Sequence, residues 1–287
     1  MKILLVASEC APFVKTGGLA DVVGALPKAL AASGGEGRVI LPLYPDLKAL
    51  ADKATATLDM GALYGGAARL HAVEAEGLSL LLLEAPHLYE RGGGIYLNEK
   101  GSDWADNAQR FAALSEAAAR VAVQGFEGWT PDLLHAHDWQ AGLAPWYLRQ
   151  MGSTLPCVIT LHNIAFQGVF DAEMVDTLKL DPAGFSMAGY EYWGKVSTLK
   201  AGVAASDKVT TVSPTYAREL MLPEFGMGFE GLLQARKGDL VGILNGIDLD
   251  IWDPETDPLI TENYTSRALK RKAANRAALE KRFDLNA

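Results

Sequence analysis

The sequence has few cysteines and no pattern of metal-binding ones. Its 287 residues contain two, Cys10 and Cys157, with neither a CxxC pair nor a cysteine–histidine zinc spacing. A disulfide framework and a structural metal are therefore not indicated. Unpaired cysteines are typical of a reducing compartment, so we expect a cytoplasmic protein.

Long apolar runs and an excess of positive charge are also missing. No stretch approaches the length of a transmembrane helix, and the apolar run in residues 1–9 is too short for a signal peptide. Acidic residues outnumber basic ones by 35 to 26, which gives a formal net charge of −9. Such a surface repels phosphate backbones and anionic membranes. We therefore expect no nucleic-acid partner and no membrane association.

The sequence does contain alternating strand and helix patterns. Short runs that are apolar on both faces suit buried parallel strands, and they occupy residues 3–7, 38–43, 78–83, 132–135, 157–161, 208–212 and 240–244. Helical periodicity between them covers Leu19–Ala32 and Trp104–Gln124, whereas Leu88–Ser102 has no periodicity and predicts an irregular excursion. This alternation predicts an α/β fold with a Rossmann-like, doubly wound parallel sheet.

The character of the chain changes after Asn245–Asp248. Two turn-forming segments follow, and then residues 267–282 carry seven Lys or Arg and one acid. We predict one compact domain over residues 1–248, followed by a linker and a charged helix over 249–287. The basic run is interpreted as a solvated helix face.

A first polar segment follows the first predicted strand. Gly17 and Gly18 allow the backbone to approach a ligand, the next helix starts with outward N–H groups, and Lys15 adds a positive charge. These features suit a cradle for a phosphate or a sugar diphosphate, although the segment is neither GxGxxG nor a Walker loop. Two alternatives stay open: a tight turn beside a solvated lysine, and Asp21 as a first-turn acid favoured by the helix dipole.

Two more polar segments follow later strands. His135 and His137 alternate onto one strand face, which suits a metal pair, but no third ligand is evident and hydrogen-bonded histidines are favoured. Asp138 could cap the next helix or bind a sugar. His162 and Asn163 can offer hydrogen bonds to hydroxyls in the same crevice as the first segment.

Six segments together resemble bacterial glycogen synthases and plant starch synthases. In chain order they read KTGGLADVVGALP, HAHDWQ, LHNIAFQG, VSPTYARE, EFGMGFEG and NGIDLDIWDP, so the resemblance covers essentially the whole chain. It implies the amino-terminal half of a GT-B glycosyltransferase fold, in which two Rossmann-like domains face each other across a cleft. It also implies that no metal and no other cofactor is needed.

The resemblance implies a retaining hexosyltransferase that moves glucose from ADP-glucose to the non-reducing end of an α-1,4-glucan such as glycogen or a maltooligosaccharide. Lys15, with Gly17 and Gly18, is similar to the family's residues near the sugar-nucleotide phosphates. The catalytic candidates are Asp138, near the reacting sugar and the acceptor, and His162, which contacts the donor glucose.

The resemblance places further substrate-binding candidates at Asp21, Tyr96, Asn163 and Asn245, of which Tyr96 lies on the acceptor side and Asn245 lines the sugar pocket. Family members continue for roughly another domain. We therefore expect that the carboxy-terminal, nucleotide-binding domain is absent from this chain and that the chain alone is inactive or nearly so. Two alternatives are a free-standing α-glucan-binding or regulatory module and a transferase that uses another nucleotide sugar.

Overall fold

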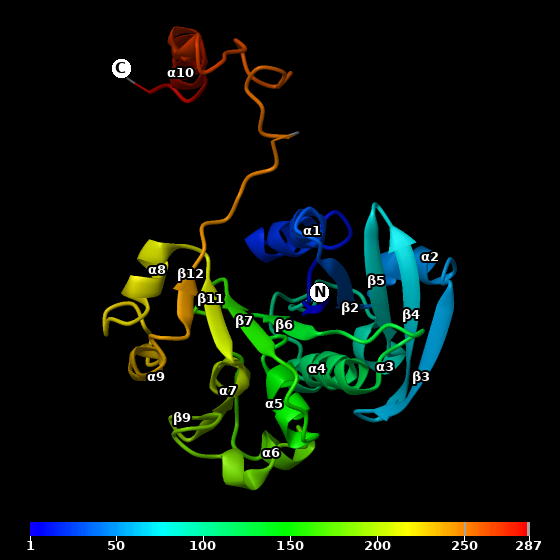
Figure 1. Ribbon diagram of the computed structural model, residues 1–287. Helices are drawn as coiled ribbons and strands as arrows, with labels where there is room; N and C mark the ends of the chain where they lie inside the picture. Colours follow the sequence, from blue (N-terminus) through cyan, green and yellow to red (C-terminus); the bar gives the residue numbers. More distant parts are fainter. Residues whose placement is uncertain (250, 286–287) are drawn as a thin grey trace. The chain divides into compact units, whose positions relative to one another are not determined.

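The computed structural model describes residues 1–249 and 251–285 and divides the chain into two compact units, Met1–Leu244 and Asn245–Ala287 (Figure 1). The first unit contains a nine-stranded sheet covered by helices. It has the α/β architecture that the strand and helix pattern predicts. The division at Leu244 lies close to the predicted boundary at residue 248.

Seven strands of the sheet are parallel and correspond to the seven predicted strands. Their order is β12-β11-β7-β6-β1-β2-β5. The interiors of the central strands are almost completely buried, which explains why their sequences are apolar on both faces. The bounds are β1 (Lys2–Val6), β2 (Glu36–Pro42), β5 (Leu78–Glu84), β6 (Leu133–His137), β7 (Cys157–Leu161), β11 (Lys208–Thr211) and β12 (Leu240–Gly242).

The sheet is mostly parallel, as predicted, but it also has an antiparallel part that the sequence pattern did not indicate. Two further strands, β4 (Gly66–Ala75) and β3 (Ala56–Leu63), extend it antiparallel beyond β5. Buried residues are interspersed with exposed ones along both strands, so neither has a continuous apolar run. A separate small antiparallel sheet joins β8 (Val169–Phe170), β10 (Lys195–Ser197) and β9 (Glu191–Tyr192), which are too short for a sequence pattern.

Helices cover both faces of the large sheet. Helix α1 (Gly18–Ala31) lies on one face, and α4 (Asn107–Gln124), α5 (Leu143–Gln150) and α7 (Thr198–Ala205) lie on the other (Figure 1). Both predicted helices are confirmed, although α4 begins three residues after Trp104. Shorter helices complete the unit: α2 (Lys48–Ala51), α3 (Pro86–Tyr89), α6 (Met174–Thr177), α8 (Pro214–Glu219) and α9 (Glu230–Ala235).

A glycine allows α5 and α7 to approach closely. A Cβ atom added to Gly142, at the start of α5, would lie 2.2 Å from the backbone oxygen of Thr198. Gly202 in α7 lies on the same contact, because a Cβ there would be 2.8 Å from the oxygen of Gly142. Any larger side chain at Gly142 must therefore push the two helices apart.

The order of the strands reverses at β1. From β1 the chain adds β2 on one side and later β6 on the other side. In open α/β sheets, ligands bind outside the carboxyl ends of the strands at such a reversal. The fold therefore brings the residues after β1, β6 and β7 together at the place where such sheets bind ligands.

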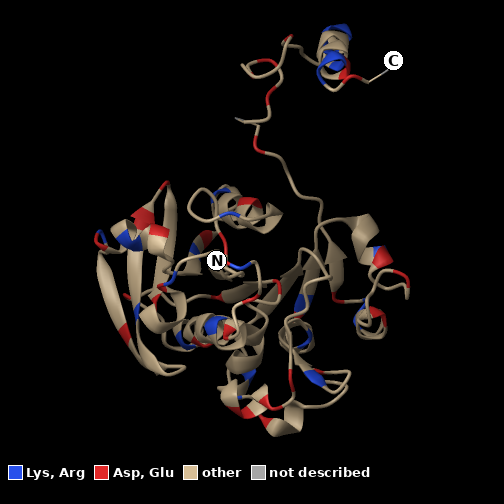
Figure 2. Ribbon diagram, turned by 180° about the vertical axis from the view of Figure 1, so that it is seen from behind, with Lys and Arg blue, Asp and Glu red and all other residues tan. Residues whose placement is uncertain are grey.

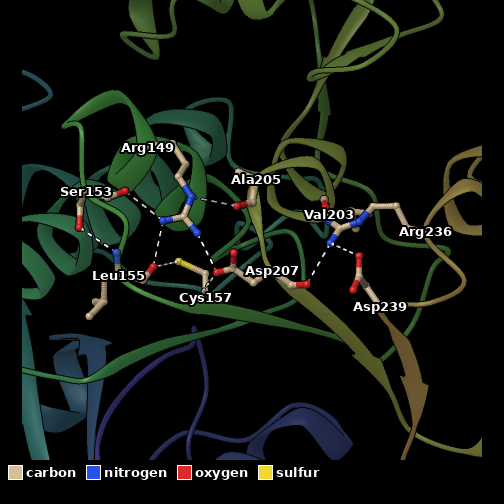
Figure 3. Close-up of polar contacts among 9 residues, drawn as sticks. All are labelled: Arg149, Ser153, Leu155, Cys157, Val203, Ala205, Asp207, Arg236 and Asp239. Atoms are coloured by element: carbon tan, nitrogen blue, oxygen red, sulfur yellow. Dashed lines mark hydrogen bonds and ion pairs between the residues drawn. The ribbon is translucent and has the colours of Figure 1, made fainter.

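At the opposite ends of the strands, their amino ends, a polar network connects neighbouring strands (Figure 3). Asp207, just before β11, accepts hydrogen bonds from the backbone N–H of Cys157 at 2.7 Å and from the guanidinium of Arg149 at 2.8 Å. Arg236 donates to the backbone oxygen of Asp207 and to Asp239, which precedes β12. These contacts join the amino ends of β7, β11 and β12.

The second unit contains a 3₁₀ turn (Leu269–Arg271) and α10 (Lys272–Arg282). Lys and Arg residues are concentrated on α10 (Figure 2), and none of the residues of this helix is buried. Asn275 binds both the N–H and the oxygen of Glu262 at 2.8 Å, which attaches the preceding loop to the helix. Among the residues with described positions, no helix is both long and apolar enough to cross a membrane.

Candidate functional site

Polar side chains gather at the carboxyl ends of three neighbouring strands. Glu9 lies three residues after β1, Asp138 directly follows β6, and His162 directly follows β7. The pairing of β1 with β6 and of β6 with β7 brings these positions side by side. This edge is the candidate site, and it coincides with the reversal of strand order.

Glu9 organises the first half of the site, and the sequence interpretation missed it. Its carboxylate is almost completely buried and accepts hydrogen bonds from both the N–H and the hydroxyl of Thr16, and from the N–H of Gly17 at 3.2 Å. The hydroxyl of Tyr96 donates to the same carboxylate at 2.5 Å. Glu9 thus holds the turn before α1 and joins it to the loop after β5. The sequence did contain a signal for this role, namely an acidic residue shortly after a buried strand.

Tyr96, the predicted acceptor-side aromatic, lies within this cluster. Its hydroxyl also contacts the hydroxyl of Ser8 at 2.7 Å, and Asn107 donates to its backbone oxygen at 3.0 Å. Burial and the neighbouring Glu9 raise the pKa of Tyr96 far above its usual value. The phenol therefore stays protonated and acts as a fixed hydrogen-bond donor to Glu9.

The turn between β1 and α1 exposes both predicted glycines. A Cβ atom added to Gly17 or Gly18 would meet nothing within 4 Å, so packing inside this chain requires glycine at neither position. Lys15 pairs with Asp21 at 2.7 Å, and both side chains are about half exposed. Asp21 is also the first-turn acid of α1, as one of the alternatives predicted. The open space beside the glycines is available to a group that the chain itself does not supply.

Asp138 has an unusual backbone conformation. Its φ is +54°, in the left-handed region, and its carboxylate accepts the backbone N–H of His162 at 2.7 Å. Helix α5 begins at Leu143 without a side-chain cap, so the alternative that Asp138 caps this helix is wrong. Such strain is characteristic of functional sites. Burial raises the pKa of Asp138 from 3.8 to about 7, an effect that the N–H groups of His162 and Asn163 partly offset.

Three histidines next to Asp138 contact one another, namely His135, His137 and His162. The rings of His135 and His137 stack with centroids 4.3 Å apart, which confirms that they share one strand face. His137 Nδ1 lies 3.0 Å from His162 Nε2, and His135 Nε2 lies 2.7 Å from the hydroxyl of Thr160. Burial lowers the pKa of His135 and of His162 to about 4, and that of His137 well below its usual value. All three rings are therefore neutral at pH 7.

Across residues 1–249 and 251–285, no group of three or more His, Cys, Asp or Glu side chains is placed to hold a metal ion. Two hollows of about 260 Å³ lie elsewhere, one against residues 124–130 and the other beside His71 and Glu84. The site described above instead combines neutral histidines with two largely buried carboxyl groups, Glu9 and Asp138.

The remaining candidates lie farther from this cluster or serve local structure. Asn163 is exposed, and its side-chain oxygen accepts the N–H of Ala165. Asn245 is exposed and belongs to the second unit, so it is described apart from the other site residues. The ring of Trp139 packs edge-on against Phe111 with centroids 4.9 Å apart, which is core packing.

Comparisons with known proteins show which proteins this chain resembles. The glycogen synthase of Roseobacter denitrificans is 59% identical over 286 residues, which are 99% of this chain and 60% of that protein. The glycogen synthase of Paracoccus denitrificans is 54% identical over 285 residues, with 99% and 59% covered. The chain thus spans about 60% of the length of these relatives.

A solved structure and a family description complete the comparison. The catalytic domain of starch synthase IV from Arabidopsis thaliana, bound to ADP and acarbose, superposes with a TM-score of 0.76 at 30% identity, over 100% of this chain and 60% of that one. The family described as starch synthase catalytic domain matches residues 2–235. The chain therefore belongs to the starch synthase catalytic domain family.

Proposed function

We propose that the protein containing this chain is a glycogen synthase, a retaining hexosyltransferase that moves glucose from ADP-glucose to the non-reducing end of an α-1,4-glucan. The observation that carries the proposal is the convergence of the glycine turn, Asp138 and His162 at one edge of the sheet. The identity to curated glycogen synthases supports it. Because the chain covers about 60% of these relatives, the activity is proposed for the whole protein.

The turn before α1 is the proposed contact for the nucleotide diphosphate. The N–H groups of Thr16 and Gly17 already donate hydrogen bonds to Glu9. The N–H groups available to a ligand are therefore those from Gly18 onward, at the start of α1. The helix dipole favours an anion at this end, and the open space at Gly18 permits close approach. Lys15 would exchange its exposed partner Asp21 for a phosphate oxygen.

Asp138 and His162 are the proposed contacts for the sugars. A neutral His162 can hydrogen-bond a sugar hydroxyl without carrying charge, whereas the carboxyl group of Asp138, when ionised, can stabilise positive charge on a sugar bound beside it. In a transfer through an oxocarbenium-like state, such groups mainly orient substrates and stabilise charge. Tyr96, Asn163 and Asn245 are proposed as further substrate contacts.

The proposed setting is the cytoplasm, with ADP-glucose and an α-1,4-glucan as substrates. Cys10 and Cys157 are free and buried, and burial raises the pKa of both thiols, to about 12 and about 11. Such thiols are inert and suit a reducing compartment. The proposed protein partner is a carboxy-terminal, nucleotide-binding domain, as the family resemblance implies.

The test is a chimera in which this chain replaces the matched part of the Roseobacter denitrificans relative. Transfer of radiolabelled glucose from ADP-glucose to glycogen is measured for the chimera and for the chain alone. We expect transfer by the chimera, little or none by the chain, and a loss of about 100-fold or more for Asp138→Asn and His162→Gln. Asp171→Asn and His87→Gln are matched controls outside the site and should retain activity.

Each alternative predicts a different outcome of the same assay. A chimera that transfers glucose from UDP-glucose but not from ADP-glucose would contradict the proposed donor. A chimera that transfers from neither, combined with binding of maltoheptaose by the chain alone, would favour a glucan-binding module instead.

A further inference from the structure

The buried contact between His137 and His162 restricts where their protons lie. His137 is fully buried, and its Nδ1 lies 3.0 Å from Nε2 of His162. The other nitrogen of His137, Nε2, is buried and has no hydrogen-bond partner in the described part of the chain. Nδ1 of His137 and Nε2 of His162 thus share one hydrogen bond, whereas Nε2 of His137 is buried without a partner among the described residues.

Two proton arrangements can make this bond. Burial lowers the pKa of both rings, so each carries one proton at pH 7. In the first, His137 Nδ1–H donates to His162 Nε2, and His162 carries its own proton on Nδ1. In the second, His162 Nε2–H donates to His137 Nδ1, and the proton of His137 must then lie on its isolated Nε2.

The surroundings favour the first arrangement. The second one leaves a buried N–H donor without an acceptor, which is rare in proteins. The first arrangement avoids this cost, because the proton of His137 lies on Nδ1 and is donated to Nε2 of His162.

We propose that His137 is a positioning residue that holds its proton on Nδ1 and thereby fixes His162 as an Nδ1–H hydrogen-bond donor. His162 then offers its substrate a donor, so it recognises an acceptor oxygen and does not remove a proton. The proton assignment stands on this geometry alone. Only the identity of the acceptor, a sugar oxygen, rests on the proposed function.

Nuclear magnetic resonance of the chain tests the assignment without any substrate. Long-range proton–nitrogen spectra of the five histidines distinguish protonated from bare ring nitrogens. We expect a protonated Nδ1 and a bare Nε2 for both His137 and His162 between pH 6 and pH 8. A protonated Nε2 on either ring, or a doubly protonated His162 in this range, would overturn the proposal.

Variants of His137 test the positioning role. His137→Asn keeps an N–H donor close to the position of Nδ1, whereas His137→Phe keeps the ring and removes the donor. With His137→Phe, we expect His162 to show a mixture of tautomers and, in the chimera, the KM for ADP-glucose to rise about three- to tenfold. His137→Asn should restore the single tautomer and most of the affinity.

A neighbouring histidine supplies the matched control. His135→Phe alters the same stack but removes only the bond to Thr160, so the His162 tautomer should not change. Far-ultraviolet circular dichroism checks that each variant folds, and if His137→Phe does not fold, the spectra of the parent and of His137→Asn still decide. An unchanged tautomer in folded His137→Phe would contradict the positioning role. An inactive chimera with the expected tautomers would count against the proposed function alone.

Discussion

Replacing Asp138 by asparagine should change how stability depends on pH. The buried carboxyl group has a pKa of about 7 in the folded chain and 3.8 in the reference state, a difference of about 3 units or roughly 4 kcal/mol. Because the folded state binds this proton more tightly, Asp138 destabilises the parent progressively as pH rises from about 4 to 7. The asparagine side chain of the Asp138→Asn variant has no ionisable group, yet its oxygen can still accept the N–H of His162.

The three histidines of the site, His135, His137 and His162, act in the opposite direction. Their folded pKa values lie below the usual 6.5, so their contribution to stability is lost as pH falls from about 6.5 toward 4. The histidines make the same contribution in the parent and in the Asp138→Asn variant, so this contribution cancels in the difference between their free energies of unfolding. The Asp138→Asn variant should therefore gain stability over the parent by up to about 4 kcal/mol between pH 4 and pH 8.

Urea unfolding followed by the fluorescence of the six tryptophans measures this difference at each pH. Asp171→Asn serves as the control, because its carboxyl group is exposed and pairs only with Lys195 at the surface. The reasoning is refuted if the difference between Asp138→Asn and the parent does not change with pH, or if it changes in the opposite direction.

Three further predictions concern the glycines, Glu9 and Lys15. Gly142→Ala should lower the free energy of unfolding by about 1–3 kcal/mol, whereas Gly17→Ala should change it by less than about 0.5 kcal/mol; equal effects in urea unfolding would contradict the packing argument. Glu9→Gln should speed amide hydrogen exchange at Thr16 and Gly17, since a charged acceptor is lost there, and unchanged exchange would be the contrary result. Lys15→Ala should leave stability nearly unchanged, because its ion pair is exposed, but should raise the KM of the chimera for ADP-glucose about tenfold or more; an unchanged KM in steady-state kinetics would exclude a phosphate contact.

The parts of the fold that follow local burial were predictable. Strands such as β1 and β7 are buried on both faces and therefore have continuous apolar runs, and alternation placed His135 and His137 on one face. By contrast, β3 and β4 alternate between buried and exposed residues at the edge of the sheet, and their sequences gave no such run. Burial on both faces is what made the central sheet visible in the sequence.

The parts of the site that depend on distant contacts were not predictable. Glu9 gains its role from Tyr96, which lies 87 positions away, and from a turn whose N–H groups fold back onto it. Similarly, the contact between His137 and His162 depends on the register between β6 and β7. Whether Asp138 caps a helix depends on where α5 begins, and only the structure shows that it begins at Leu143.

We propose that the residues at the carboxyl ends of β1, β6 and β7 bind the nucleotide sugar. Titration of the isotope-labelled chain with ADP-glucose, followed by backbone amide shifts, tests this directly. We expect the largest shifts at residues 16–18, 138 and 162–163, with small changes elsewhere in Met1–Leu244. Shifts concentrated instead around residues 124–130, or an absence of shifts at this edge under saturating ligand, would contradict it.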